Sequence, residues 1–447
     1  MANTLIPELI IIIFLFLYLL RPVFKGLRFL DGIIWLPLLS FILLICLFFA
    51  YGFRPECILL LIFTIITVLF SIPLLFGSIS VQKNDKKPRN SGTILTICGI
   101  IALIFTSIPM FVFSPKIPPV LSSENVEIRK ICNESAKKDY YLRIYYKETN
   151  PSINSPLVFL LPPESGSVYA VDKICTELME QGFDVITYSR RGFDSPAAAK
   201  SGKYLASPRQ ILKMWQAFSN GTKKRKANNW GQYLEAERQK DIEFLLPLIC
   251  RNHDEKGTTP VFLAGYGAAG SAAVFLFEQP AFSMRHANVL GIAAVESRLW
   301  RSYLEDVSSR RLEPHWLPQP EIPVLYLVSD NAFAAVSSDK TGKSGKKSGQ
   351  YRAVLDAFRN SRNPAILAAF EGTGPFAYSD VSLTHPLYAS LFPGQIKRKN
   401  NAEMHADTAA FIGNFFIDLI DPADTAPELL LPEKKAVNSA VIAERRY

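Results

Sequence analysis

The chain has 447 residues, of which 49% are hydrophobic, with a mean hydropathy of +0.14 and a formal net charge of +9. This composition is too apolar for a purely soluble protein. The six cysteines show no C-x-x-C spacing, so neither a zinc site nor a redox motif is indicated, and we expect no metal or cofactor. If Cys132, Cys175 and Cys250 form a disulfide, the sequence leaves its pairing open.

Four apolar stretches fill the first part of the chain, at residues 5–20, 33–51, 57–80 and 92–113. Each approaches the roughly 20 residues that a helix needs to cross a bilayer. Pro7 and Glu8 weaken the first stretch, which is alternatively an uncleaved signal anchor because no A-x-A-like cleavage site follows it. The sequence therefore predicts a four-helix transmembrane region over residues 1–117.

Basic residues indicate how these helices are oriented, because loops rich in lysine and arginine stay in the cytoplasm. They gather between the first two stretches and between the last two: Arg21, Lys25, Arg28, Lys83, Lys86, Lys87 and Arg89. Only Arg54 and Lys116 lie on the other side. We therefore predict a multi-pass cell-membrane protein whose C-terminal domain is on the non-cytoplasmic side, provided that all four stretches insert.

Two basic runs, at residues 223–226 and 340–347, are expected in loops of the C-terminal domain. They are either solvated loops or contacts with anionic lipid head groups next to the bilayer. Nucleic acid is not an expected partner of a domain outside the cytoplasm. The lipid bilayer is thus the partner that the sequence indicates, while a ligand, a protein partner and the oligomeric state stay open.

The C-terminal region alternates predicted strands and helices. Strands are expected at 125–132, 139–147, 156–161, 183–188, 260–264, 289–295, 323–328 and 365–370, and helices at 168–181, 208–218, 231–251 and 405–420. This alternation is typical of a mostly parallel sheet with crossover connections. We predict one α/β domain over residues 118–421, followed by a loosely ordered tail over residues 422–447.

The most informative motif in this domain is a glycine-rich turn. Residues 261–271 are typical of the nucleophile elbow, a strand–turn–helix with the pattern G-x-S-x-G in which the turn presents a reactive serine. Here Gly267 takes the place of the serine. Glycine accepts the strained backbone of such a turn, but it cannot attack a carbonyl group. The motif thus predicts an elbow without its nucleophile.

Two further motifs carry a resemblance to a known family. Residues 188–196 resemble the D-x-R-G-x-G-x-S turn, and residues 371–380 resemble the H-x-x-F-x-D stretch that bears a catalytic histidine. Together with the elbow, residues 125–419 resemble the α/β-hydrolase superfamily, most closely platelet-activating-factor acetylhydrolase and related lipase-like members. The resemblance implies an α/β-hydrolase-like fold with a mostly parallel central sheet.

Placed on the motifs of that family, the catalytic triad is degenerate. The nucleophile position is Gly267, the histidine position is Pro375 and the acid position is Asp330. Glu164 and Ala268 stand at the oxyanion loop, where backbone N–H groups would face developing negative charge. The resemblance therefore implies an inactive hydrolase-like domain that serves a binding or interaction role at the membrane surface.

Two alternatives stay open. A rearranged esterase or lipase would use Ser271 as its nucleophile and His405 or His385 as its base, although these residues also suit structural roles. A dinucleotide-binding site would use the G-x-G-x-x-G spacing of residues 265–270, with Glu296 after the next strand. That spacing normally opens the first βαβ unit of a domain, which disfavours a dinucleotide here.

Overall fold

The structure is a computed structural model of the 447-residue chain. It describes residues 5–24, 27, 30–51, 57–79, 90–113, 125–146, 155–163, 171–190, 193–194, 197–198, 204–205, 223–254, 257–306, 311–314, 316–329, 352–370, 373, 378, 401–420 and 441–446. The chain divides into two compact units, which we describe separately. They are Met1–Pro118 with Gly202–Ala206, and Pro119–Ser201 with Ser207–Tyr447.

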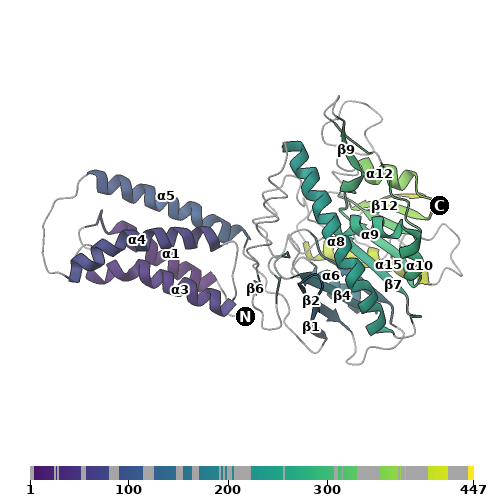
Figure 1. Cartoon of the computed structure of the whole chain (residues 1–447), viewed down its shortest axis with the longest axis horizontal. Helices are drawn as coiled ribbons and strands as arrows, with labels where there is room; N and C mark the ends of the chain where they lie inside the picture. The colour runs from purple at the N-terminus through teal and green to yellow at the C-terminus, as the bar shows by residue number, and fades with distance from the viewer. Residues whose placement is uncertain are drawn as a thin grey trace. The chain divides into compact units, whose positions relative to one another are not determined.

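The first unit is a bundle of apolar helices: α1 (Leu5–Leu20), α3 (Leu36–Tyr51), α4 (Ile58–Ile79) and α5 (Asn90–Phe113), with the 3-10 helix η1 (Asp31–Trp35) before α3. Helix α1 contacts α3 and α5, and α4 contacts the same two helices (Figure 1). Each helix coincides with one predicted apolar stretch.

The prediction of four membrane spans is supported for one of these helices. Within the described residues, only Gly32–Ala50 is long and apolar enough to cross a membrane, judged by length and composition. The described apolar parts of the other helices are shorter: Ile6–Leu20, Ile58–Pro73 and Ile94–Met110.

The second unit is built on a sheet that has nine strands in the described part of the chain, in the order β1-β2-β4-β3-β7-β8-β11-β12-β13. Their bounds are β1 (Val126–Asn133), β2 (Lys138–Tyr145), β3 (Leu157–Leu161), β4 (Asp184–Arg190), β7 (Val261–Tyr266), β8 (Val289–Val295), β11 (Val324–Leu327), β12 (Ala365–Phe370) and β13 (Val441–Arg446). The strands from β4 to β12 in this order are parallel to one another. Strands β1, β2 and β13 pair antiparallel at the edges. The predicted parallel sheet is therefore confirmed for its centre.

Short strands and helices complete the described elements. The strands are β5 (Ala197–Ala198), β6 (Tyr204–Leu205), β9 (Tyr303–Asp306) and β10 (Arg311–Pro314), the last two forming an antiparallel hairpin. The helices are α6 (Asp172–Glu180), α8 (Lys223–His253), α9 (Ala268–Phe277), α10 (Pro280–Arg285), η4 (Trp300–Ser302), α12 (Arg352–Arg359) and α15 (Asn401–Ile420).

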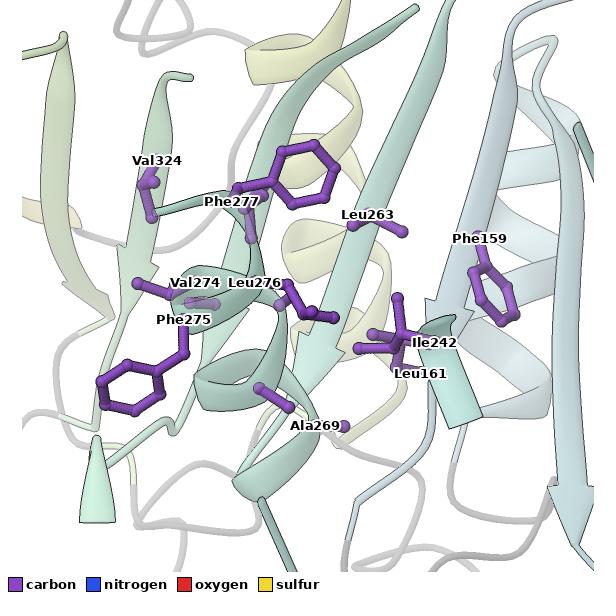
Figure 2. Close-up of a cluster of buried hydrophobic side chains, with 14 of the residues drawn as sticks. Phe159, Leu161, Ile242, Leu263, Ala269, Val274, Phe275, Leu276, Phe277 and Val324 are labelled. Carbon is purple, nitrogen blue, oxygen red and sulfur yellow. The ribbon is translucent and has the colours of Figure 1, made fainter. Parts of the chain in front are cut away.

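Helices cover both faces of the central sheet. Residues of α8, α9 and α12 form a hydrophobic cluster with one face, and residues of α6 and α15 form a second cluster with the other face. Along β7, Leu263 belongs to the first cluster and Phe262 to the second, because successive side chains of a strand alternate between faces. Figure 2 shows part of the first cluster, where Leu161 of β3 lies beside Ile242 of α8, and Leu263 of β7 lies on the side toward α9.

Two sequence-based expectations are wrong. Val441–Arg446 forms β13 on the open edge of β12, although a loosely ordered tail is expected there, because the local sequence does not reveal which sheet edge is free. Helix α8 begins at Lys223, so the basic run at residues 223–226 forms its first turn and not a loop. The second basic run and the predicted helix over residues 208–218 lie outside the described residues.

Candidate functional site

The turn between β7 and α9 has a backbone conformation that few residues adopt. Gly267 joins the two elements with φ 54° and ψ −123°. At positive φ a Cβ atom crowds the backbone, so this position favours glycine. The Gly267 N–H donates to the carbonyl oxygen of Val295 in β8 at 2.8 Å, which fixes the turn to the neighbouring strand.

Strand β7 and helix α9 approach so closely at this turn that side chains are excluded. A Cβ atom on Gly270 would overlap the carbonyl oxygen of Gly265 and the Oγ atom of Ser297, and one on Gly265 would overlap the backbone of Gly270. Packing between strand and helix thus accounts for Gly265 and Gly270, and the positive φ of the turn accounts for Gly267. Strand β7 is also central in the sheet and follows the first βαβ unit, β3-α6-β4, which removes the dinucleotide-binding alternative.

Ser271, the substitute nucleophile of the sequence analysis, is held inside the protein. Its hydroxyl group donates to the carbonyl oxygen of Gly267 at 3.2 Å and accepts the N–H of Leu299 at 3.1 Å. His405 is equally buried, but it lies on α15, which packs on the face of the sheet opposite to α9. The structure therefore does not bring Ser271 and His405 together as nucleophile and base.

A buried carboxyl group on α8, which the sequence does not predict, binds the same turn that donates to Ser271. Glu235 of α8 is 0% exposed and accepts the backbone N–H groups of Trp300 at 2.5 Å and Arg301 at 2.8 Å. Burial raises the pKa of Glu235 to about 8, although the guanidinium of Arg301 and these N–H groups oppose the shift. Glu235 therefore titrates far above the range of an exposed glutamate.

The N–H groups that Glu235 and Ser271 accept belong to a strained turn after β8. Glu296 and Leu299 have φ angles of 50° and 52°, which are uncommon for residues with side chains. Trp300 packs so closely on α8 that a Cβ atom on Gly231 would overlap its indole ring. Such strain persists only where surrounding contacts impose it, and it gathers at functional sites.

A second buried polar cluster lies where α8 meets the carboxyl ends of β3 and β4. Arg238 of α8 binds both carboxylate oxygens of Asp194. It also donates to the hydroxyl oxygen of Tyr188 at 3.1 Å and to the carbonyl oxygen of Pro163 at 3.3 Å. One guanidinium group thus ties the segments that follow both strands to α8.

Arg190, the last residue of β4, extends this cluster. It lies 2.5 Å from Asp241 and 3.1 Å from Glu237, both on α8. Tyr140 donates to Asp241 at 2.9 Å, and the Lys138 ammonium lies 3.2 Å from Glu237. Opposite charges are paired throughout, as burial of ionised groups requires. The motif over residues 188–196 therefore supplies Arg190 and Asp194 to a structural network.

A buried tyrosine anchors the segment that follows β12. The Tyr378 hydroxyl donates to the carbonyl oxygen of Val328 at 2.7 Å and accepts the N–H of Phe370 at 3.1 Å. Thr373 lies 3.1 Å from the same hydroxyl group and donates to the carbonyl oxygen of Phe370 at 2.6 Å. These bonds tie the segment predicted to bear the histidine position to the carboxyl ends of β11 and β12.

The structure describes only some of the remaining sequence-predicted positions. Glu164, Asp330, Pro375 and His385 lie outside the described residues, so their roles stay predictions. Ala268 begins α9 directly after Gly267, where its N–H belongs to the first turn of the helix. Within the residues that the structure describes, no group of three histidine, cysteine, aspartate or glutamate side chains could hold a metal ion.

Comparisons with known proteins bear on the two units separately. A family model described as "TP_0976_N: N-terminal domain" matches residues 2–112, which is less than half of the chain. The search of curated proteins gave no match.

Solved structures resemble the second unit. Three of them are a ferulic acid esterase from Streptomyces cinnamoneus, a dienelactone hydrolase-like promiscuous phosphotriesterase from metagenomic libraries, and an α/β serine hydrolase without lid from Xanthomonas campestris. Their sequence identities to this chain are 14%, 14% and 13%, with TM-scores of 0.48, 0.34 and 0.32. The matches cover 74%, 66% and 57% of this chain and 98%, 99% and 88% of theirs.

The chain's own geometry indicates the fold of this unit. A central parallel sheet follows an antiparallel pair of strands, and the turn after β7 holds a residue at positive φ. That combination is the strand–turn–helix arrangement of an α/β-hydrolase. The second unit therefore has an α/β-hydrolase-like fold, while the finer likeness to platelet-activating-factor acetylhydrolase stays a prediction.

Proposed function

We propose that the second unit is a hydrolase-like domain that binds a ligand or a partner at a membrane surface without hydrolysing it. The observation that carries this proposal is the turn at Gly267, with its φ of 54° and ψ of −123°. In the α/β-hydrolase fold this turn presents the nucleophile. Glycine has no side-chain atom with which to attack a carbonyl group, so covalent catalysis is absent at this position.

The contacts of Ser271 support the same proposal. Its hydroxyl group is buried and hydrogen-bonded to the carbonyl oxygen of Gly267 and the N–H of Leu299. A nucleophile must reach the carbonyl carbon of a substrate, and Ser271 would have to leave both partners to do so.

The membrane part of the proposal is supported by the distribution of polar side chains in the first unit. The interior of the bundle holds polar residues that are 5% exposed or less: Glu8, Ser40, Thr64, Ser71 and Ser107. Large apolar side chains face outward instead, with Phe49 77% exposed and Phe70 73% exposed. Lipid favours apolar exteriors, and polar residues in membrane helices turn toward the bundle interior.

We further propose that all four helices span the cell membrane, so that the second unit is outside the cytoplasm. Helix α8 begins with the basic run at residues 223–226, which is suited to anionic lipid head groups. A reporter that is active only outside the cytoplasm, fused at Tyr447, should give a signal. A cytoplasmic reporter at the same point should stay silent, and the reverse result would overturn this orientation.

The proposal of a non-hydrolytic domain is tested on the purified full-length protein in detergent. Short-chain nitrophenyl esters should be hydrolysed no faster than in buffer with detergent. A serine-directed fluorophosphonate should leave the chain unlabelled. An adduct mapped to any serine of the second unit would contradict the proposal.

An active esterase with a rearranged site is the second candidate function. The observation that favours it is the strain at Glu296, whose buried side chain directly follows β8, next to the strand end that Gly267 binds. Ester turnover that Glu296→Gln abolishes would establish this candidate. Turnover that is equal in the wild-type protein and the variant would remove it.

A further inference from the structure

Arg143 of β2 carries a buried guanidinium group that is engaged on only one side. Its side chain is 1% exposed, and its Nη1 atom donates to a carboxylate oxygen of Asp172, the first residue of α6, at 3.2 Å. In the described part of the chain, the Nε and Nη2 atoms of Arg143 are buried and have no hydrogen-bond partner. These two atoms form the edge of a guanidinium that binds two oxygens of a carboxylate or phosphate at once.

Two hydroxyl groups of the neighbouring strand lie on the same face of the sheet as Arg143. Thr187 of β4 pairs directly with Arg143 in the antiparallel register, which places their Cβ atoms about 4.5–5.5 Å apart. Ser189 lies two residues further along β4, so its side chain is on the same face. Both residues are 0% exposed, and among the described residues neither hydroxyl oxygen has a hydrogen-bond partner.

These polar atoms have the chemistry of an anion site. An unpaired buried polar group costs free energy, so native proteins leave few of them. Each of the two guanidinium nitrogens and each hydroxyl group has a hydrogen to donate, and an anion accepts from all of them. Helix α6 adds the positive end of its dipole, because it begins at Asp172, which Arg143 binds.

The other charged groups at this place are paired. Asp172 binds Nη1 of Arg143 and accepts the hydroxyl group of Tyr145 at 2.5 Å, so the carboxylate holds the guanidinium in one orientation. Lys173, the next residue of α6, lies 2.7 Å from Glu177, and this second pair adds no net charge. An anion would therefore meet one opposing carboxylate, which the guanidinium and the helix dipole offset.

We propose that Arg143, Thr187 and Ser189 form a buried site for a small oxyanion, a carboxylate or phosphate group, beside the N-terminus of α6. Nε and Nη2 of Arg143 bind two of its oxygens, and the hydroxyl groups of β4 donate to it. The site is on the face of the sheet that α6 and α15 cover, whereas α9 packs on the other face. The proposal therefore does not rest on the function proposed for the turn at Gly267.

Equilibrium dialysis of the full-length protein in detergent tests the site, with radiolabelled phosphate and radiolabelled acetate as separate probes. Sodium chloride keeps the ionic strength constant, so that screening is the same at every probe concentration. At least one probe should bind at one site per chain. Binding of phosphate alone or acetate alone would show which oxyanion the site takes, and binding of neither would overturn the proposal.

Two variants assign the bound probe to this site. Thr187→Val removes one donor at nearly constant volume and should weaken binding about tenfold or more, because hydrogen bonds to charged groups are strong. In buffer without oxyanions this variant should be at least as stable as the wild type, since it removes a buried hydroxyl group that the described chain does not pair. Arg143→Lys keeps a positive charge beside Asp172 but loses the two-nitrogen edge, so it should also weaken binding.

Thr408→Val is the matched control. Thr408 is buried on α15, on the same side of the sheet, but its hydroxyl group donates to the carbonyl oxygen of Met404 at 2.7 Å. The control should lose stability and keep its affinity for the probe. Binding that either Thr187→Val or Arg143→Lys leaves unchanged would mean an adventitious ion only, and would overturn the proposal. So would a loss of stability in Thr187→Val equal to that of the control, because the Thr187 hydroxyl would then have a partner within the protein.

Discussion

Arg238 and Asp194 form a bidentate ion pair whose side chains are 1% and 0% exposed. The pair joins the middle of α8 to the segment after β4, 44 residues away in sequence. Arg238 also holds the carbonyl oxygen of Pro163, so the same group fixes the end of β3. The pair thereby sets the position of two segments at the carboxyl edge of the sheet, where Gly267 also lies.

Arg238→Met should be strongly destabilising, because it leaves the Asp194 carboxylate buried without its guanidinium partner. Removing one member of a buried ion pair typically costs about 3–5 kcal/mol. Chemical denaturation of the full-length protein measures the loss. The double variant Arg238→Met with Asp194→Leu should be less destabilised than the sum of the single variants, because no buried charge is then left unpaired.

The exposed pair Arg129–Glu127 is the control for this prediction. Its side chains are 48% and 41% exposed, and its atoms lie 3.0 Å apart. Arg129→Met should change the free energy of unfolding by no more than about 0.5 kcal/mol. Equal losses in the Arg129 and Arg238 variants would contradict the role given to the buried pair.

Gly270→Ala should destabilise the protein through close contact, because the added Cβ atom would overlap the carbonyl oxygen of Gly265. Overpacking of this kind typically costs about 1–3 kcal/mol. Gly257→Ala is a useful comparison: its φ of 66° is positive, but no atom lies within 4 Å of the added Cβ. Gly257→Ala should lose stability through backbone strain alone, on the order of 1 kcal/mol. Thermal unfolding of both variants compares the two effects, and a Gly270 variant as stable as wild type would contradict the packing argument.

The sequence predicts the glycine turn well because its determinants are local. A buried strand, three glycines and the start of a helix lie within residues 261–271, and Gly267 adopts the positive φ that the motif requires. Glu235 and Arg238 were missed because their partners are distant in the chain. The hydrogen-bond partners of Glu235 lie 65 and 66 residues away, and no local pattern connects them.

The same reasoning explains the other differences. The basic run at residues 223–226 resembles a loop because cations are disfavoured at a helix N-terminus, yet α8 begins there. Strand β13 depends on the free edge of β12, which is a property of the whole sheet. Ser271 looks like a substitute nucleophile in sequence. In the fold its hydroxyl group has a structural role, because it accepts the N–H of Leu299 from the turn after β8.

The stability of the protein should depend on pH through Glu235. Its pKa is raised from 4.5 to about 8 in the folded protein, so folding favours the protonated form. The contribution of Glu235 to the free energy of unfolding is fully present below pH 4.5 and is lost as the pH rises through 8. Glu235→Gln should flatten that decline in urea denaturation midpoints. A decline of equal slope in the variant would show that another group is responsible.

Gly267→Ser should place a hydroxyl group where the α/β-hydrolase fold presents its nucleophile. The positive φ of 54° should cost stability, about 1–3 kcal/mol, because serine now occupies it. We expect weak labelling of this variant by a fluorophosphonate, with the adduct mapped to position 267. If Pro375 stands at the histidine position, adding Pro375→His should speed labelling by about 10²–10⁴-fold through general base assistance.

Ser271→Ala in the Gly267→Ser background is the control for this prediction. Ser271 is buried and hydrogen-bonded, so its removal should leave the site of labelling at position 267. Labelling of Gly267→Ser with Pro375→His no faster than that of Gly267→Ser alone would remove Pro375 from the histidine position. A folded Gly267→Ser protein that the probe never labels would contradict the interpretation of Gly267 as the nucleophile position of the turn.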